Sequence, residues 1–318
     1  MMMRRNKEII LTSALIFGPL LVLGGFFLWA NISVGDVKVS KEVEAEKPLL
    51  NPFETVSLDA EAAYVKNTQT GEVYFSKNEN KSLALASLTK VMTVLVANKL
   101  LENKSVWLRP DDLNTEGESG FFTYESFNTK DLIDFTLVGS SNDGAAALAF
   151  SAGSILKRDD SANFSSDDLF VLEMNKLASK IGMDNTKFEN ATGLDENIFN
   201  ASAFGSAKDV TVLFEYVLKN EPRILEATKH NKVNIYSEQG LPHTIENTNE
   251  IVDSLPNILG SKTGYTDIAG GNLAVVIDPG LNTPIIITVL NSTKEGRFKD
   301  VKALTEATLG YLQIQDKK

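Results

Sequence analysis

Cysteine is absent from this 318-residue sequence, and histidine occurs only twice, as His230 and His243. Without cysteine the chain forms no disulfide, no thiolate metal site, no cysteine nucleophile and no lipid-modified cysteine anchor. Two histidines argue against a histidine-rich zinc site, and we expect no metal or organic cofactor. A serine–histidine–aspartate triad would have to use one of the two, and neither lies beside a recognisable nucleophile motif.

Excess positive charge is also missing. The formal net charge is −11, and 43% of the residues are hydrophobic. An acidic chain without a basic stripe argues against a nucleic-acid partner. The hydrophobic content suits one large domain or two smaller ones with an ample core.

The N-terminal part contains one long apolar run. Three basic residues within the first seven precede a run from Ile9 to about Ile32. A bilayer core needs roughly 20 apolar residues in a helix, and basic flanks stay on the cytoplasmic side. We therefore predict that residues 1–32 are a single-pass anchor in the cell membrane, with the rest of the chain extracytoplasmic. A cleaved signal peptide is the alternative, because Ser33-Val34-Gly35 offers a small-x-small pattern.

Residues 33–55 are charged and poor in aromatics, which is typical of a tether, and residues 56–318 form the predicted soluble domain. Strand-like runs lie near both ends of that domain and helical patterns fill the middle. This order predicts an α+β fold, an antiparallel sheet flanked by helices with a helical insert. The expected strands are 62–65, 72–75, 258–265, 272–277 and 285–290. The expected helices are one starting near Ser87, then 130–138, 145–152, 166–181, 210–218 and 298–312.

The pattern Ser87-x-x-Lys90 opens the first of these helices, with Val91 and Met92 beside the lysine. A serine hydroxyl is a poor nucleophile unless a base lies within hydrogen-bond reach. Lysine becomes such a base when burial lowers its pKa, because burial disfavours the charged ammonium. Alone, the pattern is better explained by a capping serine and a surface lysine. It recurs as Ser154-x-x-Lys157, which opens no such helix and is interpreted as surface.

Two further short patterns follow in order, Ser140-x-Asn142 in a loop before a helix and Lys262-Thr263-Gly264 in a strand. Each is weak evidence alone, since Ser76-x-Asn78 and Ser161-x-Asn163 match the first of them. The ordered set of three, each at a structural junction, carries the weight. That set is the one associated with penicillin-binding proteins and class A β-lactamases.

The chain resembles the serine D-alanyl-D-alanine carboxypeptidases, the low-molecular-mass penicillin-binding proteins, from about Leu58 to Leu312. Further segments that resemble this family are Phe188–Leu194, Ser206–Asp209, Asn247–Asn249 and Gly260–Gly270. The resemblance implies the β-lactamase and D,D-peptidase fold. It also implies a peptidoglycan stem peptide ending in D-Ala-D-Ala as substrate, and β-lactams as inhibitors.

The resemblance assigns the catalytic roles as follows. Ser87 attacks the peptide carbonyl and forms an acyl-enzyme, and Lys90 takes its proton. Ser140 relays a proton to the leaving amine. Lys262 sets the local field and suits a substrate that ends in a carboxylate.

The same resemblance assigns the substrate contacts. The hydroxyl of Thr263 binds the carboxylate, and Asn142 holds the substrate amide. Gly264 has no side chain, so the substrate backbone can approach the strand. The N–H groups of Ser87 and Tyr265 form the oxyanion hole.

Three other functions stay open. Only about fifty residues follow Gly264, so we expect the catalytic domain without the second β-rich domain that many of these carboxypeptidases carry. Short relatives include D,D-endopeptidases, which cut cross-links. A class A β-lactamase needs a glutamate between the second and third motifs, but Glu189 and Glu196 lack the expected Glu-x-x-Leu-Asn context. A non-catalytic wall-binding protein has no need for the whole set, so carboxypeptidase is preferred.

Overall fold

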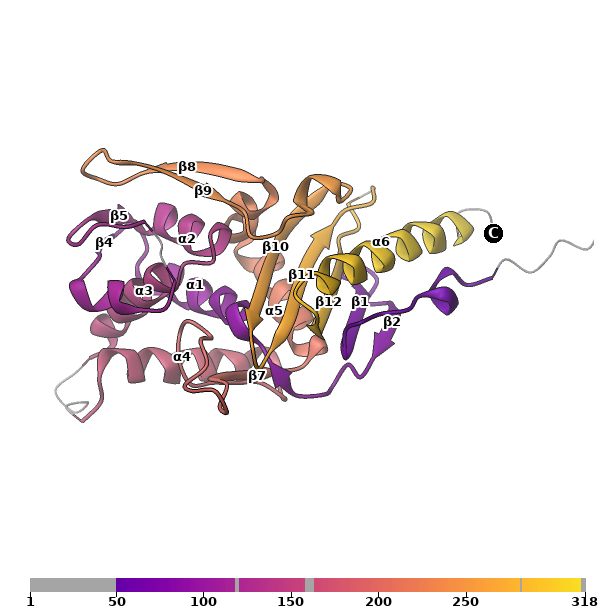
Figure 1. The fold of residues 1–318 in the computed structure, drawn as a ribbon, viewed down its shortest axis with the longest axis horizontal. Helices are drawn as coiled ribbons and strands as arrows, with labels where there is room; N and C mark the ends of the chain where they lie inside the picture. The colour runs from indigo at the N-terminus through magenta and orange to yellow at the C-terminus, as the bar shows by residue number, and fades with distance from the viewer. Residues whose placement is uncertain (1–49, 118–119, 158–162, 281, 316–318) are drawn as a thin grey trace, which may run out of the picture. The chain divides into compact units, whose positions relative to one another are not determined.

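The computed structural model describes residues 50–117, 120–157, 163–280 and 282–315, shown as a ribbon in Figure 1. The predicted anchor, residues 1–32, lies outside these ranges, as does most of the predicted linker. None of the helices within the described ranges is long and apolar enough to cross a bilayer.

A five-stranded antiparallel sheet is assembled from both ends of the described chain, as predicted. Its strand order is β10-β11-β12-β1-β2, and Ala62 of β1 lies opposite Leu290 of β12. The strands are β1 (Ala62–Asn67), β2 (Val73–Lys77), β10 (Ile258–Thr266), β11 (Gly270–Ile277) and β12 (Ile285–Ser292). The expected α+β class is therefore confirmed.

Successive side chains of a strand point to opposite faces, and here each face has its own core. On one face Ala274, Val276 and Ile286 pack with the helical part of the molecule. On the other, Leu273, Val275 and Ile287 pack against α6 (Gly296–Gln315). Figure 1 shows α6 in front of the sheet and α5 (Ala207–Asn220) behind it. The sheet is thus buried on both sides, and β10 is left at the edge that faces the helical part.

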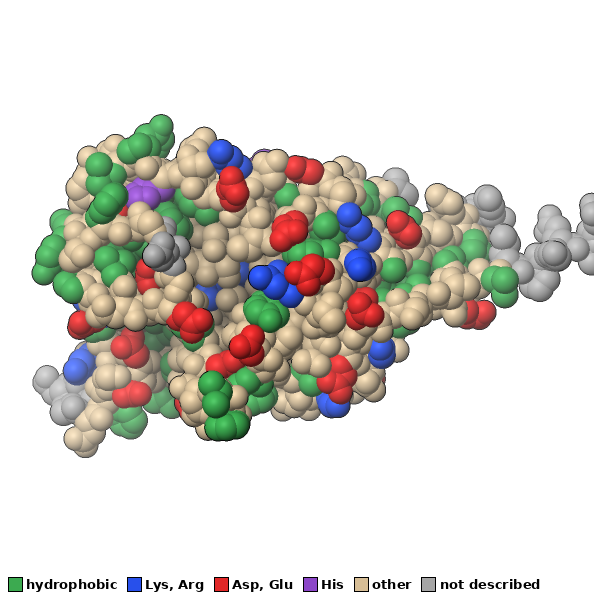
Figure 2. All heavy atoms as spheres, in the orientation of Figure 1, with side chains coloured by type: hydrophobic (Ala, Val, Ile, Leu, Met, Phe, Trp, Pro, Cys, Tyr) green, Lys and Arg blue, Asp and Glu red, His purple; other side chains and the backbone are tan. Residues whose placement is uncertain are grey.

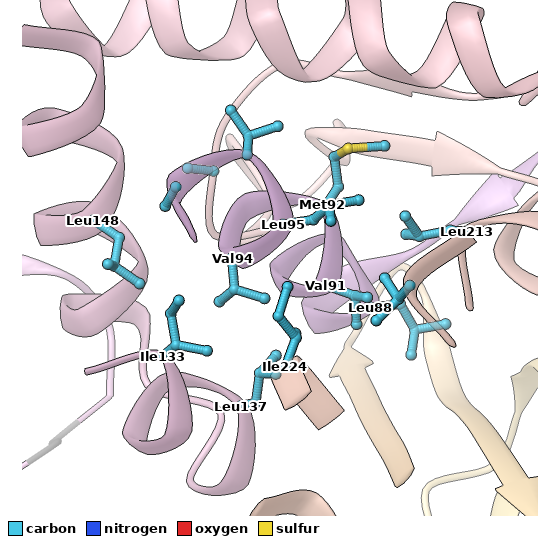
Figure 3. Close-up of a cluster of buried hydrophobic side chains, with 14 of the residues drawn as sticks. Leu88, Val91, Met92, Val94, Leu95, Ile133, Leu137, Leu148, Leu213 and Ile224 are labelled. Atoms are coloured by element: carbon cyan, nitrogen blue, oxygen red, sulfur yellow. The ribbon is translucent and has the colours of Figure 1, made fainter. Parts of the chain in front are cut away.

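The helical part surrounds α1 (Thr89–Leu100), in which every residue from Thr89 to Ala97 is buried. The helix is enclosed on all sides over these residues, which suits a core helix. Figure 3 shows its side chains among residues of the neighbouring helices. The labelled neighbours come from α2 (Thr129–Val138), α3 (Asn142–Leu156), α5 and the 3-10 helix Pro222–Lys229. Helix α4 (Ser166–Ile181) packs against α1 as well. Lys90 is consequently held inside this core.

Helix ends follow the sequence closely. Ser165 accepts a hydrogen bond from the N–H of Asp168, whose carboxylate accepts one in return, and α4 ends at Gly182 with φ +84°. Ser206 likewise accepts from the N–H of Asp209 at the start of α5. The Asp209 carboxylate, however, accepts from the Asn185 N–H and the Thr186 hydroxyl, so the expected capping box is only half formed.

One helix begins earlier than predicted. Residues 142–144 were expected in a loop before a helix at Ala145, but α3 starts at Asn142. The reason is that Ser141 takes the capping position and accepts a hydrogen bond from the Gly144 N–H. Asn142 therefore lies in the first turn of a helix, which gives its side chain a defined direction.

Two small hairpins and a three-stranded sheet were not predicted. The hairpins are β4 (Ser105–Trp107) with β5 (Ser126–Asn128), and β8 (Lys232–Tyr236) with β9 (Pro242–Glu246). The small sheet joins β3 (Leu83–Ala84), β7 (Ala203–Gly205) and β6 (Lys187–Phe188). Short 3-10 helices cover Pro52–Thr55, Ala86–Leu88, Pro110–Asn114, Pro222–Lys229 and Val252–Ser254.

Candidate active site

Ser87 lies in the 3-10 turn that leads into α1, and the backbone before it is strained. Ala86 has φ +47°, which a residue with a Cβ rarely adopts. Two anchors hold this turn: the Leu85 N–H donates to the Ala203 carbonyl at 2.9 Å, and the buried Asn272 amide donates to the Leu85 carbonyl at 3.1 Å. Such strain persists only where the surroundings enforce it, and it is common at active sites.

Lys90 is fully buried one turn after Ser87, and its amine meets three oxygens. Nζ lies 2.9 Å from Ser87 Oγ, 2.6 Å from Asn142 Oδ1 and 2.7 Å from the Thr192 carbonyl. Burial lowers the pKa of Lys90 to about 7. The charged and neutral forms are therefore both accessible near neutral pH.

The three partners dictate what the neutral amine does. A neutral amine has two hydrogens and one lone pair. The Asn142 and Thr192 oxygens can only accept, so they take the two hydrogens. The lone pair is then left for the Ser87 hydroxyl, the arrangement that a general base needs. The geometry thus provides an activated serine without a histidine.

Ser140 and Lys262 form a second pair. The Lys262 ammonium donates to Ser140 Oγ at 2.8 Å and to the Thr263 carbonyl at 2.9 Å. Ser140 itself has φ +57°. Burial, followed by the charges of Lys90 and Arg297, holds the pKa of Lys262 well below its usual value. An incoming anion would oppose that shift by favouring the charged form.

The two pairs belong to one site. Lys90 is among the charges that lower the pKa of Lys262, and the strand that carries Lys262 runs against the Ser87 turn. A Cβ added to Gly264 would lie 2.8 Å from the Leu85 carbonyl and 3.3 Å from the Ser87 nitrogen. Only glycine allows β10 to come this close to the Ser87 turn, a packing role that the sequence did not predict for Gly264. In Figure 2 blue Lys or Arg side chains lie in the hollow between the helical part and the strands.

Thr263 and Tyr265 lie on either side of Gly264 in β10. The Thr263 hydroxyl pairs with that of Thr248 at 2.6 Å. Tyr265 follows Gly264, and its side chain is 43% exposed with its hydroxyl donating to Asp267. The backbone of Tyr265 continues the strand past Ser87, and its side chain points to solvent. The role expected of Tyr265, as an oxyanion-hole donor, uses only its backbone N–H.

Three residues that contact the site residues were not predicted from the sequence. Thr192 acts through its carbonyl, which any residue supplies, although the segment Phe188–Leu194 had been noted. Thr248 lies within the noted Asn247–Asn249 run. Arg297 gave no signal: it is buried, and its guanidinium donates to the Gly264 carbonyl at 2.8 Å.

The competing matches lie elsewhere. Ser154 and Lys157 are both exposed, and the Ser76 hydroxyl donates to Glu79. His243 is buried against Glu125, 2.6 Å from its carboxylate, and not beside Ser87. Ser161 lies outside the described residues. Within those residues no three His, Asp or Glu side chains are grouped to hold a metal ion.

The family model described as D-alanyl-D-alanine carboxypeptidase, Peptidase_S11, matches residues 45–294. The carboxypeptidase DacF of Bacillus subtilis is 29% identical over 256 residues, covering 78% of this chain and 61% of that protein. DacA of Escherichia coli is 28% identical over 265 residues, covering 78% and 60%. The chain thus spans about three fifths of the length of these curated relatives.

Solved structures of penicillin-binding proteins and DD-transpeptidases are similar to this chain as well. Penicillin-binding protein D2 of Listeria monocytogenes, in its ampicillin-bound form, is 30% identical with a TM-score of 0.65, covering 79% of this chain and 98% of that one. A mutant of the Streptomyces K15 DD-transpeptidase, 24% identical with a TM-score of 0.69, shares the fold. With the family model covering most of the described residues, the chain belongs to the D-alanyl-D-alanine carboxypeptidase family, Peptidase_S11.

Proposed function

We propose that this protein is a serine D,D-carboxypeptidase that removes the terminal D-Ala from peptidoglycan stem peptides. One observation carries the proposal: the Lys90 amine lies 2.9 Å from the Ser87 hydroxyl, with its pKa lowered to about 7. A buried serine–lysine pair of this kind supplies nucleophile and base together.

In the acylation step, Ser87 Oγ attacks the carbonyl carbon of the penultimate D-Ala and passes its proton to Lys90. The N–H groups of Ser87 and Tyr265 stabilise the negative charge on the carbonyl oxygen. The peptide C–N bond then breaks, and the leaving amine receives a proton through Ser140. Water hydrolyses the Ser87 ester, with Lys90 again as the base, and restores the free hydroxyl.

The substrate ends in a carboxylate, and the site has a place for it. Lys262 and the Thr263 hydroxyl offer a cation and a donor, and Lys262 is buried so that the charge is poorly screened. Asn142 Nδ2 would hold the amide on the acyl side. β-Lactams would acylate the same serine, as the ampicillin-bound form of penicillin-binding protein D2, a similar structure, supports.

The principal alternative is a D,D-endopeptidase that cuts cross-links. Some cross-links also place a carboxylate beside the scissile bond, so the charge of Lys262 does not separate the two. What favours the carboxypeptidase is the family match and the names of the curated relatives. The test gives the purified full chain a pentapeptide and a cross-linked muropeptide dimer at equal concentration. We expect the higher kcat/KM for the pentapeptide; faster cleavage of the dimer would reverse the assignment.

Labelled penicillin separates the remaining alternatives. A carboxypeptidase forms a stable acyl-enzyme on Ser87, a β-lactamase releases the label within seconds, and a non-catalytic wall-binding protein takes none. The β-lactamase has little support here, because neither Glu189 nor Glu196 stands in the expected Glu-x-x-Leu-Asn context.

We also propose that residues 1–32 anchor the protein in the cell membrane with the catalytic domain outside. The basic residues before the apolar run Ile9–Ile32 support this orientation. Fractionation of cells should recover the full-length chain with the membrane. A shortened, released protein that starts near residue 36 would identify the segment as a cleaved signal peptide.

A further inference from the structure

A cavity of about 260 Å³ adjoins the catalytic residue Ser140 and the predicted substrate contact Asn142. Ser140 and Asn142 line one side of it, and β9 supplies the other through Thr244, Ile245 and Glu246. A substrate held at Ser140 and Asn142 therefore has part of its chain at the mouth of this cavity.

Glu116 lies next to the place where the acyl part of the substrate is held. Asn142 Oδ1 is occupied by Lys90, and one hydrogen of Asn142 Nδ2 goes to the Glu116 carbonyl at 2.5 Å. The other hydrogen of Nδ2 is the one available to the substrate amide. The residue that flanks that amide thus comes close to Glu116.

The cavity carries negative charge. Glu116 and Glu246 both line it and are exposed, whereas none of the described Lys, Arg and His residues does. Neither carboxylate forms an ion pair within the described ranges, although Lys232 lies opposite Glu246 in the β8–β9 register. At Lys262, by contrast, the charge is positive. The site therefore suits a substrate with a carboxylate at one end and an ammonium group farther along.

The backbone of the β9 wall is held by contacts on both sides of the strand. His243, next to Thr244, is buried against the Glu125 carboxylate at 2.6 Å, which joins β9 to the segment before β5. After β9, the Thr248 N–H donates to the Val138 carbonyl at 3.1 Å. A preorganised wall discriminates better than a mobile one.

We propose that Glu116, assisted by Glu246, selects stem peptides whose residue before D-Ala-D-Ala carries a free, lysine-type side-chain amino group. This inference rests on the proposed function, because it assumes that a D,D-peptide occupies the site. Glu116 takes the larger share, since Lys232 offsets part of the charge of Glu246. The attraction is between partly exposed charges, so salt weakens it.

The test measures binding and needs no turnover. Two peptides ending in D-Ala-D-Ala, one with lysine and one with acetyl-lysine before that pair, compete with fluorescent penicillin for Ser87 in the full chain. We expect the lysine peptide to slow labelling at about fivefold lower concentration, with the ratio shrinking as KCl rises. Glu116→Gln should reduce the ratio to below twofold, and Glu246→Gln should reduce it by less. Glu102→Gln, an exposed glutamate at the end of α1, is the matched control and should keep it.

Each variant is compared with itself, as a ratio of two peptides, so a general change in labelling rate cancels. Equal competition by the two peptides, including no competition by either, overturns the inference. An undiminished ratio in Glu116→Gln does so as well. If the chain released D-Ala from both peptides at equal rates, the proposed carboxypeptidase activity would be supported and the proposed selectivity for lysine would be refuted. The two proposals can therefore be refuted independently.

Discussion

Two Ser-x-x-Lys patterns occur in this chain, and they lie at opposite ends of helices. Ser87 stands in the turn before α1, with Lys90 fully buried in the first turn. Ser154 lies in the last turn of α3, where its hydroxyl donates to the Phe150 carbonyl at 2.8 Å. Lys157 follows the helix and is exposed.

The difference shows which physical conditions make a nucleophile. A helix N-terminus favours developing negative charge, and a C-terminus favours cations. Ser87 therefore gains from its end of α1, and burial makes Lys90 a base. At the end of α3 the hydroxyl is engaged by a carbonyl and the lysine is hydrated. The two Ser-x-x-Lys patterns have the same spacing, and they differ in their position on the helix and in the burial of the lysine.

The largest expected effect compares the two serines directly. Ser87→Ala should abolish covalent labelling by penicillin, because it removes the hydroxyl that faces the Lys90 amine, while Ser154→Ala should label like the unaltered chain. Gel fluorescence after labelling measures both. Label that persists without Ser87 would refute the assignment.

The two lysines give the next largest effect. Lys90→Met keeps an apolar side chain of similar length in the core but removes the base, so the acylation rate should fall about 10²- to 10⁴-fold. Lys157→Met should leave the rate unchanged. Stopped-flow or quenched labelling measures the acylation rates of both variants. A loss below tenfold in Lys90→Met, with the variant folded by circular dichroism, would assign the base elsewhere.

Lys262 has no counterpart in the second pattern, and its removal tests the carboxylate contact. Lys262→Ala should lower kcat/KM for a pentapeptide more than for a neutral ester. Charge-assisted hydrogen bonds contribute roughly 1.5–3 kcal/mol, or about ten- to more than a hundredfold. Equal losses for both substrates would show that Lys262 acts on catalysis without selecting the carboxylate.

The smallest effect is a pH dependence. With the pKa of Lys90 lowered to about 7, its neutral form rises with pH, so ester acylation should increase about tenfold from pH 6 to pH 8 and then level off. The neutral ester keeps the charge of Lys262 out of the measurement. A flat profile over this range would mean that Lys90 is not the titrating base.

Much of this site was predictable because its side chains have few substitutes. A nucleophile and its base each require a reactive side chain, so the ordered set that begins with Ser87 and Lys90 and ends with Lys262 is visible in sequence, whereas the Ser-x-x-Lys pattern alone is not decisive. The five-stranded sheet followed from period and turn signals at both ends of the domain.

The remainder depends on contacts that leave no local pattern. The Thr192 carbonyl is a backbone group, so residue type says nothing about it. The positive φ of Ala86 and Ser140 is imposed by tertiary packing against the preference of both residues. The β8–β9 hairpin turns at Gly240, with φ +80°, but its position as one wall of the cavity is held by distant partners such as Glu125.

The pairing of β1 with β12 has a consequence for how the protein is made. Strands near the two ends of the described chain must meet before the sheet closes, a topology of high contact order that folds slowly. During synthesis Ser87 and Lys90 emerge long before β10 and β12. The growing chain thus carries its nucleophile without the strand that flanks it, and reactivity appears only after the last strands have joined.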